Sequence, residues 1–373
     1  MANLEQADQI IRRFMAQADN LGQLQDPDGR LVARELIELL TTADENLKTR
    51  LEKILDRNDP DEIFSEVELA LFLANAIDEI NRTTRQLEIL LNRSGLRVMD
   101  ESITRVETFL YRANRAFTDE ILPVRIDRAL RTRLQPMLLD RHATSIDRYG
   151  KAMVRRINQI MVRGMLRGKT QSQMVDELVQ IRGPRGVVSL RAVQIQPGMV
   201  VRVAEENVPE GLFMRYRSWA WRIVRTEMSE AQNASHLASI QGHRDQFPDI
   251  KKKILATFDL RTAMDSVGVH GQVRPVDGYF MDGAGRVYQR PPSRPHDREV
   301  VIPWRDRWRE TQYTQPPTEA KIKELKQLST DEIEDLRARA TRERRSQSQN
   351  RRSARVMLRP MAIPRRMRAQ PRQ

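Results

Sequence analysis

The chain has 373 residues, of which 39% are hydrophobic, 31% charged and 5% aromatic, a length that allows two or three packing units of roughly 100–200 residues each. Because it contains no cysteine, disulfides and thiolate metal sites are excluded. Residues 1–20 lack the apolar core of a signal peptide, and no apolar run reaches the roughly 20 residues that span a bilayer. We therefore expect a protein without membrane contact, used in a reducing cytoplasm or in a particle assembled there.

Helical spacing of apolar residues dominates the first 180 residues. Asp59-Pro60-Asp61-Glu62 combines an N-cap acid, a first-turn proline and a glutamate at the third position, which predicts the start of a long helix. We expect Ser94-Gly95 to end it. The predicted buried face of this helix consists of Ile63, Val67, Ala70, Ala74, Ile77, Ile80, Leu87 and Leu91.

Three further helices are predicted before residue 181. Thr170-Gln171-Ser172-Gln173 has the form of a capping box before a short one, which carries Met174, Leu178 and Ile181. Of the two longer helices before it, we expect Pro123 to kink the first and Gly168 to end the second. The apolar positions of the first are Ile103, Val106, Leu110, Ala113, Phe117, Ile121 and Val124, and those of the second are Ile146, Met153, Ile157, Ile160 and Gly164.

The pattern changes to β-structure after residue 186. The runs Val187–Ile195 and Met199–Val203 flank Gln196-Pro197-Gly198, which suits a type II turn and predicts an inserted hairpin. Helix is predicted again from about Arg215 to His243, with Trp221, Val224, Met228, Ala231 and Ala238 on one face. From Lys252 to Pro303, short apolar runs alternate with glycine and proline, which indicates a small α+β module. The predicted fold is therefore mainly α, with long N-terminal helices, an inserted β-hairpin, a small α+β subdomain and a C-terminal tail.

The positive charge is concentrated in that tail. Thirteen arginines and a single acid, Glu343, lie between Leu336 and Gln373, so this segment carries +12 of the total charge of +13. So few apolar residues cannot offset the chain entropy, and we expect the tail to be disordered on its own. Arginine binds phosphate in bidentate geometry, so we predict sequence-independent contact with double-stranded DNA that weakens steeply with salt. The predicted DNA-binding residues are Arg342, Arg344, Arg345, Arg351, Arg352, Arg355, Arg359, Arg365, Arg366, Arg368 and Arg372.

Two other roles of the tail stay open. A solvated basic tail can serve solubility alone, and an anionic protein surface can replace DNA as its target. Truncation after about Thr341 tests these alternatives, because unchanged DNA retention across a salt series would show that the tail is not the DNA contact.

One acidic residue falls on a predicted buried face. Glu227 lies between Val224 and Ala231 at helical spacing, so its carboxylate needs a charge-assisted partner. Arg261, in the loop Asp259-Leu260-Arg261-Thr262, offers one. We predict a Glu227–Arg261 pair that docks the helix on the α+β module; the alternative is an exposed helix glutamate.

Six short motifs follow one another between about residues 145 and 303. They are Gly164–Gly168, Thr170–Ile181, Arg225-Thr226-Glu227 with Asn233, Asp259-Leu260-Arg261-Thr262, His270-Gly271-Gln272-Val273 and Pro291–Arg298. In order and spacing they resemble the head morphogenesis, or minor head protein, family of tailed phages, which includes the Mu F protein. The predicted hairpin interrupts the match. The residues to which we assign structural roles in this module are Arg225, Glu227, Asp259, Arg261 and His296.

The chain departs from that family at a cysteine clamp of the zinc type. Where many members have these cysteines, this chain has Ala263, Ser266, Asp297 and Glu299. A mixed nitrogen and oxygen metal site stays an alternative, but we expect packing and hydrogen bonds to hold the module without a metal or another cofactor. The sequence has no phosphate loop, no His-Glu-x-x-His and no Gly-x-Ser-x-Gly, so we expect no enzyme. The residues of the alternative metal site are Asp265, His270, His296, Asp297 and Glu299.

The resemblance implies a virion structural protein, a minor head protein inside the capsid near the portal. It would be made in the host cytoplasm and assist head assembly and DNA packaging or ejection. The expected partners are the portal protein, the major capsid or scaffolding protein, double-stranded DNA and other copies of the chain. The predicted domains are a helical region (1–143), the family module (144–310, with the hairpin at 187–203), a linker with short helices (311–341) and the tail (342–373).

The sequence leaves two alternative functions open. One is a nucleic-acid-condensing protein unrelated to phages, in which the tail is the whole function. The other is a metal-dependent hydrolase or nuclease built on His270 and His296, which predicts metal in the purified protein.

Overall fold

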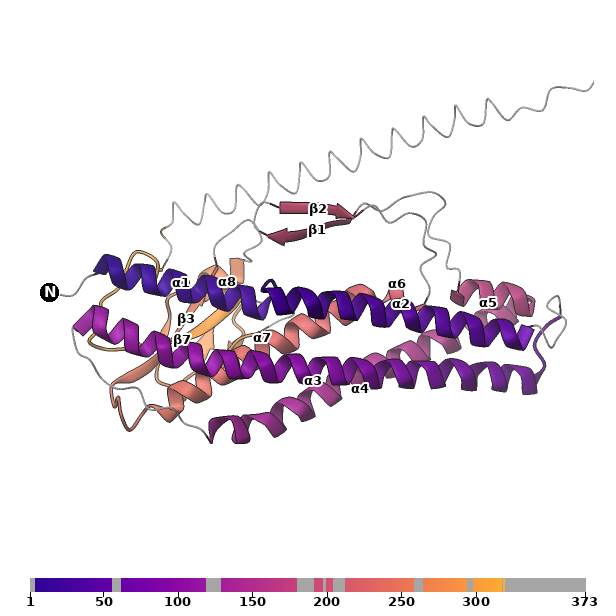
Figure 1. Cartoon of the computed structure of the whole chain (residues 1–373), viewed down its shortest axis with the longest axis horizontal. Coiled ribbons are helices and arrows are strands. Elements are labelled where there is room, and N and C mark those ends of the chain that lie inside the picture. Colours follow the sequence, from indigo (N-terminus) through magenta and orange to yellow (C-terminus); the bar gives the residue numbers. More distant parts are fainter. Residues whose placement is uncertain are drawn as a thin grey trace, which may run out of the picture. The chain divides into compact units, whose positions relative to one another are not determined.

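The computed structural model describes residues 4–55, 62–118, 129–179, 191–196, 199–203, 212–257, 264–293, 298–316 and 318 (Figure 1). The helices of its N-terminal part are α1 (Leu4–Gly22), α2 (Pro27–Leu55), α3 (Glu66–Thr118), α4 (Leu130–Leu166) and α5 (Gln171–Val179). They are followed by β1 (Arg191–Gln196), β2 (Met199–Val203), α6 (Leu212–Arg215) and α7 (Arg217–Gly242). The last elements are β3 (Ile250–Ala256), α8 (Met264–Val269), β4 (Val273–Arg274), β5 (Phe280–Met281), β6 (Val287–Tyr288) and β7 (Glu299–Arg305). The described part is thus mainly helical with a small antiparallel sheet, which confirms the predicted fold class.

Helix α3 is the longest of the described elements and has helices on several sides. It has 53 residues and packs against α1, α2, α4 and α7. In Figure 1, α1 and α2 follow one another along α3. A helix of this length is stabilised mainly by the neighbours that cover its apolar residues.

The first turn of α3 begins later than predicted. Glu62 is not helical, and residues 59–61 lie outside the described residues. Instead, Glu68 N donates to Ser65 Oγ at 3.3 Å, and Ser65 N donates to Glu68 Oε2 at 2.8 Å. This reciprocal pair is a capping box, so Ser65 is the N-cap of α3.

Ser94 and Gly95 lie inside α3 and do not end it. Both are buried, and a Cβ atom on Gly95 would lie 2.4 Å from Cε1 of His142 on α4. The glycine therefore allows the two helices to approach closely. The predicted helix end is wrong because this glycine serves helix packing and not termination.

The first turns of α3 and the residues just before them also expose side chains that were predicted to be buried. Ile63 is 55% exposed and Val67 is 80% exposed. Phe64 and Phe72 are buried instead, with their ring centroids 5.1 Å apart, and large aromatic rings gain most from burial. The residues that are buried as predicted are Ile80, Leu87 and Leu91, whereas Ala70 and Ala74 are exposed and Ile77 is half-buried.

The other predicted helices are present at the described positions, except that the one from Ile103 is the C-terminal half of α3 and not a separate helix. In α7, Val224, Met228 and Ala231 are buried as predicted, whereas Trp221 and Ala238 are half-buried. The predicted faces from Ile103 to Phe117 and from Ile146 to Gly164 are buried. Gly168 follows α4 with a φ of 62°, a left-handed conformation that suits glycine. Thr170 N donates to Gln173 Oε1 at 3.3 Å, and Gln173 N donates to Thr170 Oγ1 at 3.4 Å, so the capping box before α5 is present. Ile121, Pro123, Val124 and Ile181 lie outside the described residues.

The inserted hairpin is also confirmed. β1 and β2 pair antiparallel, with Val193 opposite Val201 and Gln196 opposite Met199. Residues 187–190, 197 and 198 lie outside the described residues.

The α+β subdomain is built on a three-stranded antiparallel sheet with the order β4-β3-β7. β3 pairs with β7 from Ile250 opposite Arg305 to Ala256 opposite Glu299. Strands β5 and β6 form a separate two-stranded pair. Helix α7 packs against β7, so it connects the helical part with the sheet.

Two hydrophobic clusters form the core. The first combines side chains of α2, α4, α5 and α6 with the N-terminal part of α3 and the first half of α7. The second combines α1, the C-terminal part of α3 and the end of α7 with β3 and β7. Because α3 and α7 contribute to both clusters, the described elements belong to one compact unit.

The predicted domain boundary at residues 143 and 144 falls within α4, which is continuous there. No described helix combines the length and apolarity that a membrane span requires.

Candidate functional site

Helix α7 carries the Arg-Thr-Glu motif and is surrounded by other elements. It packs against α1, α3, α4, β3 and β7. Every residue from Glu227 to Leu237 is buried, although the sequence predicted only one buried face. Buried polar side chains are costly unless they are hydrogen-bonded, so the partners of these residues define the site.

Glu227 is held by α4. It is 4% exposed, which confirms its predicted burial. Its Oε2 accepts from Arg141 Nε at 2.7 Å, and its Oε1 accepts from Ser145 Oγ at 2.8 Å. Arg261 lies outside the described residues, so the Glu227–Arg261 pair stays a prediction.

Glu230, one turn further along α7, extends this site to the segment before Pro291. Its Oε1 accepts from Arg290 Nη2 at 2.6 Å and lies 3.6 Å from Arg141 Nη1. Burial of the Arg141 guanidinium lowers its pKa. The nearby negative charges of Glu230 and Glu227 have the larger combined effect, so the Arg141 pKa is raised. We call Arg141, Ser145, Glu227, Glu230 and Arg290 the α7 charge network.

Asn233 and His236 attach α7 to the sheet. Asn233 Oδ1 accepts from Val301 N at 3.0 Å, and its Nδ2 donates to the carbonyl oxygen of Glu299 at 3.3 Å. His236 Nδ1 donates to the carbonyl oxygen of Val301 at 2.9 Å. Burial lowers the His236 pKa to about 4, so this ring is neutral at physiological pH. Amide and imidazole groups thus connect a helix to β7 without any charge.

Comparisons of the chain with models of known protein families, with curated proteins and with solved structures found no match. The role of the α7 charge network therefore has to be inferred from its own contacts. These contacts join α4, α7 and the segment that leads into β7, as expected of structural residues.

Of the other residues with predicted structural roles, only Arg225 lies within the described part of the chain. Arg225 is half-buried on α7. Asp259 and His296 lie outside the described residues, as does Arg261.

His270 is buried, and both of its ring nitrogens are hydrogen-bonded to the backbone. Nδ1 accepts from Ala256 N at 3.0 Å, and Nε2 donates to the carbonyl oxygen of Tyr313 at 3.0 Å. Burial lowers the His270 pKa to about 4. Neither nitrogen has a free lone pair for a metal or a substrate proton in this conformation.

The other residues of the alternative metal site do not complete it within the described part of the chain. Glu299 accepts a hydrogen bond from Tyr288 Oη at 2.6 Å. His296, Asp297 and the side chain of Asp265 lie outside the described residues.

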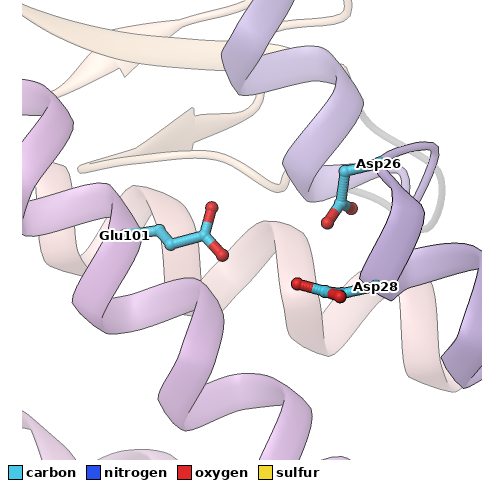
Figure 2. Close-up of side chains that lie close together, drawn as sticks. All are labelled: Asp26, Asp28 and Glu101. Atoms are coloured by element: carbon cyan, nitrogen blue, oxygen red, sulfur yellow. The ribbon is translucent and has the colours of Figure 1, made fainter.

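A different acidic group lies between α2 and α3. Figure 2 shows Asp26 and Asp28 pointing toward Glu101, and their carboxylates are close enough to share a cation. Arg97 already supplies that cation, because its Nη1 lies 2.6 Å from Asp26, 3.5 Å from Asp28 and 3.1 Å from Glu101. Burial of the Arg97 guanidinium lowers its pKa, but the hydrogen bond that it donates to Asp26 and the attraction of the three acids have the larger combined effect, so its pKa is raised. The group is therefore an ion-pair network that ties α2 to α3.

β3 contains two buried lysines, and no pattern in the sequence indicated their burial. Lys252 Nζ donates to the carbonyl oxygen of Gln289 at 2.7 Å, and burial lowers its pKa to about 8. Lys253 pairs with Glu310, and its Nζ lies 4.1 Å from the centroid of the Trp304 ring. Both ammonium groups have backbone, acidic or aromatic partners, so we assign them to the packing of the sheet.

The predicted DNA-binding arginines, from Arg342 to Arg372, all lie outside the described residues.

Proposed function

We propose that this chain is a virion structural protein of a tailed phage, a minor head protein inside the capsid near the portal. It has no enzymatic role. It assists head assembly and the packaging or ejection of DNA, and it contacts DNA through its arginine-rich tail. It is made in the host cytoplasm and enters the particle there.

The observation that carries the proposal is the way the motifs of the family resemblance pack together. The Arg-Thr-Glu helix contacts the chain on both sides of the Pro291-Pro292 segment. Glu230 binds Arg290 just before that segment, and Asn233 binds Val301 just after it. The helix that carries the Arg-Thr-Glu motif is thus hydrogen-bonded to residues that flank the Pro291–Arg298 motif, 60 or more residues further along the chain, as expected if the order and spacing of the motifs reflect a shared fold.

The tail supplies the proposed DNA contact. Its arginines carry almost all of the net charge, and phosphate contact by such a segment is independent of sequence. The folded part supplies the proposed docking to the portal protein, to a capsid or scaffolding protein, or to further copies of the chain.

The function is tested in purified particles from cells that carry the gene. We expect mass spectrometry to find the chain at a few copies in DNA-filled heads. Deletion of the gene should reduce the yield of filled heads, and the intact gene should restore it. Particles that lack the chain, together with a normal yield after deletion, would refute the proposal.

The DNA contact is tested in the full-length chain by changing the eleven predicted DNA-binding arginines of the tail to glutamine. The logarithm of the binding constant for duplex DNA should then depend less steeply on the logarithm of salt concentration, by about 0.9 per lost phosphate contact. The matched control changes the same arginines to lysine, which keeps the charge and should keep most of the salt dependence. An unchanged slope in the glutamine variant would remove the tail from the DNA contact.

A further inference from the structure

The charge of the described helices is distributed unevenly. α4 has eight basic residues and two acidic ones. By contrast, α2 has five basic and six acidic residues, and α3 has seven basic and eight acidic ones. The near-neutral average of the chain outside the tail therefore conceals one strongly basic helix.

The basic residues of α4 continue through an acid-free stretch. Between Asp147 and Asp176 the sequence contains no acidic residue. The seven basic residues in this interval are Arg148, Lys151, Arg155, Arg156, Arg163, Arg167 and Lys169.

Several of these cations lie on the solvent side of α4. Arg148, Arg155 and Arg163 are exposed, whereas Tyr149 and Ile157 beside them are buried. Intervals of seven and eight residues are close to two helical turns, so the three arginines recur on one side over about 22 Å of helix. Lys151 lies between them with its side chain 70% exposed. We call Arg148, Lys151, Arg155 and Arg163 the α4 basic face.

Few acids within the described residues neutralise this face. Lys151 pairs with Asp147 in the same helix, at 2.7 Å. Arg148, Arg155 and Arg163 form no ion pair with any described residue. The basic residues nearer the start of α4 differ, because Arg131 pairs with Asp100 and Arg141 with Glu227.

We propose that the α4 basic face is a second DNA-binding surface, separate from the tail. Duplex DNA presents one negative charge per roughly 1.7 Å of its axis, so a straight row of cations can follow it. Between Arg148 and Arg163 the exposed positions are basic or amide side chains except for Val162, and basic and amide groups are the residue types that contact phosphate. Val162 lies at the end of this face, whereas a protein partner would require apolar contacts in its centre. This inference goes beyond the proposed tail contact and depends on α4 alone.

The test is the full-length variant R148Q/R155Q/R163Q, with binding to fluorescent duplex DNA of about 30 base pairs measured over a salt series. The slope of the logarithm of the binding constant against the logarithm of salt concentration should fall by about 2.7, since each lost phosphate contact removes about 0.9. The matched control R13Q/R112Q/R115Q removes three exposed arginines from α1 and α3 and should leave the slope unchanged. Circular dichroism checks that both variants remain folded.

Three results would overturn the inference. The first is an unchanged slope in R148Q/R155Q/R163Q, and the second is an equal loss in the control. The third is weaker binding to polyglutamate with unaltered binding to DNA, which would assign the face to an acidic protein partner.

Combination with the glutamine variant of the tail separates the two DNA contacts. If the inference holds, the α4 substitutions lower the slope by the same amount whether or not the tail arginines are present. If only the tail substitutions lower the slope, the α4 surface is refuted and the proposed tail contact stands. If only the α4 substitutions lower the slope, the tail contact is refuted and the α4 surface stands.

Discussion

Gly95 shows how the absence of one side chain determines the distance between two long helices. The His142 ring occupies the space where a Cβ atom of Gly95 would lie, and His142 Nδ1 donates to Asn92 Oδ1 at 2.9 Å. A buried ring that is held in this way cannot move aside cheaply.

Replacement of Gly95 by alanine is therefore expected to destabilise the protein. In an open helix the change gains about 1 kcal/mol, but here overpacking should reverse the sign and cost about 1–3 kcal/mol in the free energy of unfolding. The measurement is urea denaturation. Gly150→Ala is the matched control, because its Cβ would lie at a milder 3.2 Å from Thr84 Cγ2. A Gly95→Ala protein as stable as the wild type would contradict the close approach.

The buried histidines predict how stability depends on pH. Burial lowers the pKa values of His142, His236 and His270 to about 4, from the usual 6.5. The unfolded chain then binds more protons than the folded one between these values, so stability is fully present above about pH 6.5 and decreases as the pH falls towards 4.

Urea denaturation between pH 7 and pH 5 measures this effect. We expect the free energy of unfolding to fall with a slope that corresponds to uptake of up to about three protons on unfolding. His142→Gln should reduce the uptake by about one proton, because one of the three titrating rings is removed. A free energy that stays constant across this range would contradict the lowered pKa values, because the folded and unfolded chains would then bind equal numbers of protons.

At the scale of the element, α7 is held by paired charges and amides along its length. The α7 charge network connects it to α4, and Asn233 and His236 connect it to β7. Removal of one member of a buried pair leaves its partner without compensation, which costs more than the pair itself contributes.

A double-mutant cycle on Glu227 and Arg141 tests the network. We expect Glu227→Gln and Arg141→Gln each to lower the free energy of unfolding by about 1–3 kcal/mol. The double variant should lose less than the sum of the two, with a coupling of about 1 kcal/mol or more. Arg261→Gln in the same series tests the predicted Glu227–Arg261 pair. Additive effects of Glu227 and Arg141 would mean that their contact contributes nothing.

The helices and the hairpin could be predicted where local signals act alone. The capping box at Thr170, the terminal Gly168 and the paired runs around residues 197 and 198 are local features, and the structure has the corresponding elements. The prediction failed where the role of a residue depends on a neighbouring helix. Gly95 has the same sequence signature whether it ends a helix or admits a histidine from another one.

The candidate site was predictable only in part, for the same reason. Burial of Glu227 followed from its spacing, but the partners Arg141 and Arg290 come from distant segments that no periodicity connects. The small residues of α7, such as Ser229, Ala231, Ala234 and Ser235, are a signal that was not used. Their size lets neighbours approach from every side, which explains why residues 227–237 of α7 are all buried.

At the scale of the whole molecule, α3 and α7 connect the two hydrophobic clusters. Because both helices pass through both clusters, the described part should unfold as one cooperative unit. The sheet should therefore respond to a defect in the distant cluster.

Leu91→Ala tests this coupling. Leu91 is fully buried in the first cluster, and its truncation should cost about 2–5 kcal/mol. The free energy of opening measured by hydrogen exchange for β3 and β7, in the second cluster, should fall by the same amount, so their amides exchange faster. Leu166→Ala, at a leucine that is 82% exposed, is the control and should change neither quantity. Unchanged exchange in the sheet of Leu91→Ala would separate the clusters into independent units.

The central claim concerns a folded body docked on head proteins and a basic tail bound to the genome. Imaging of the intact particle at side-chain detail tests it most directly. We predict that the chain lies inside the head beside the portal, with tail arginines such as Arg351 and Arg365 within about 3 Å of DNA phosphate oxygens. Tail arginines far from both the genome and any acidic neighbour, or a head without this chain, would contradict the account.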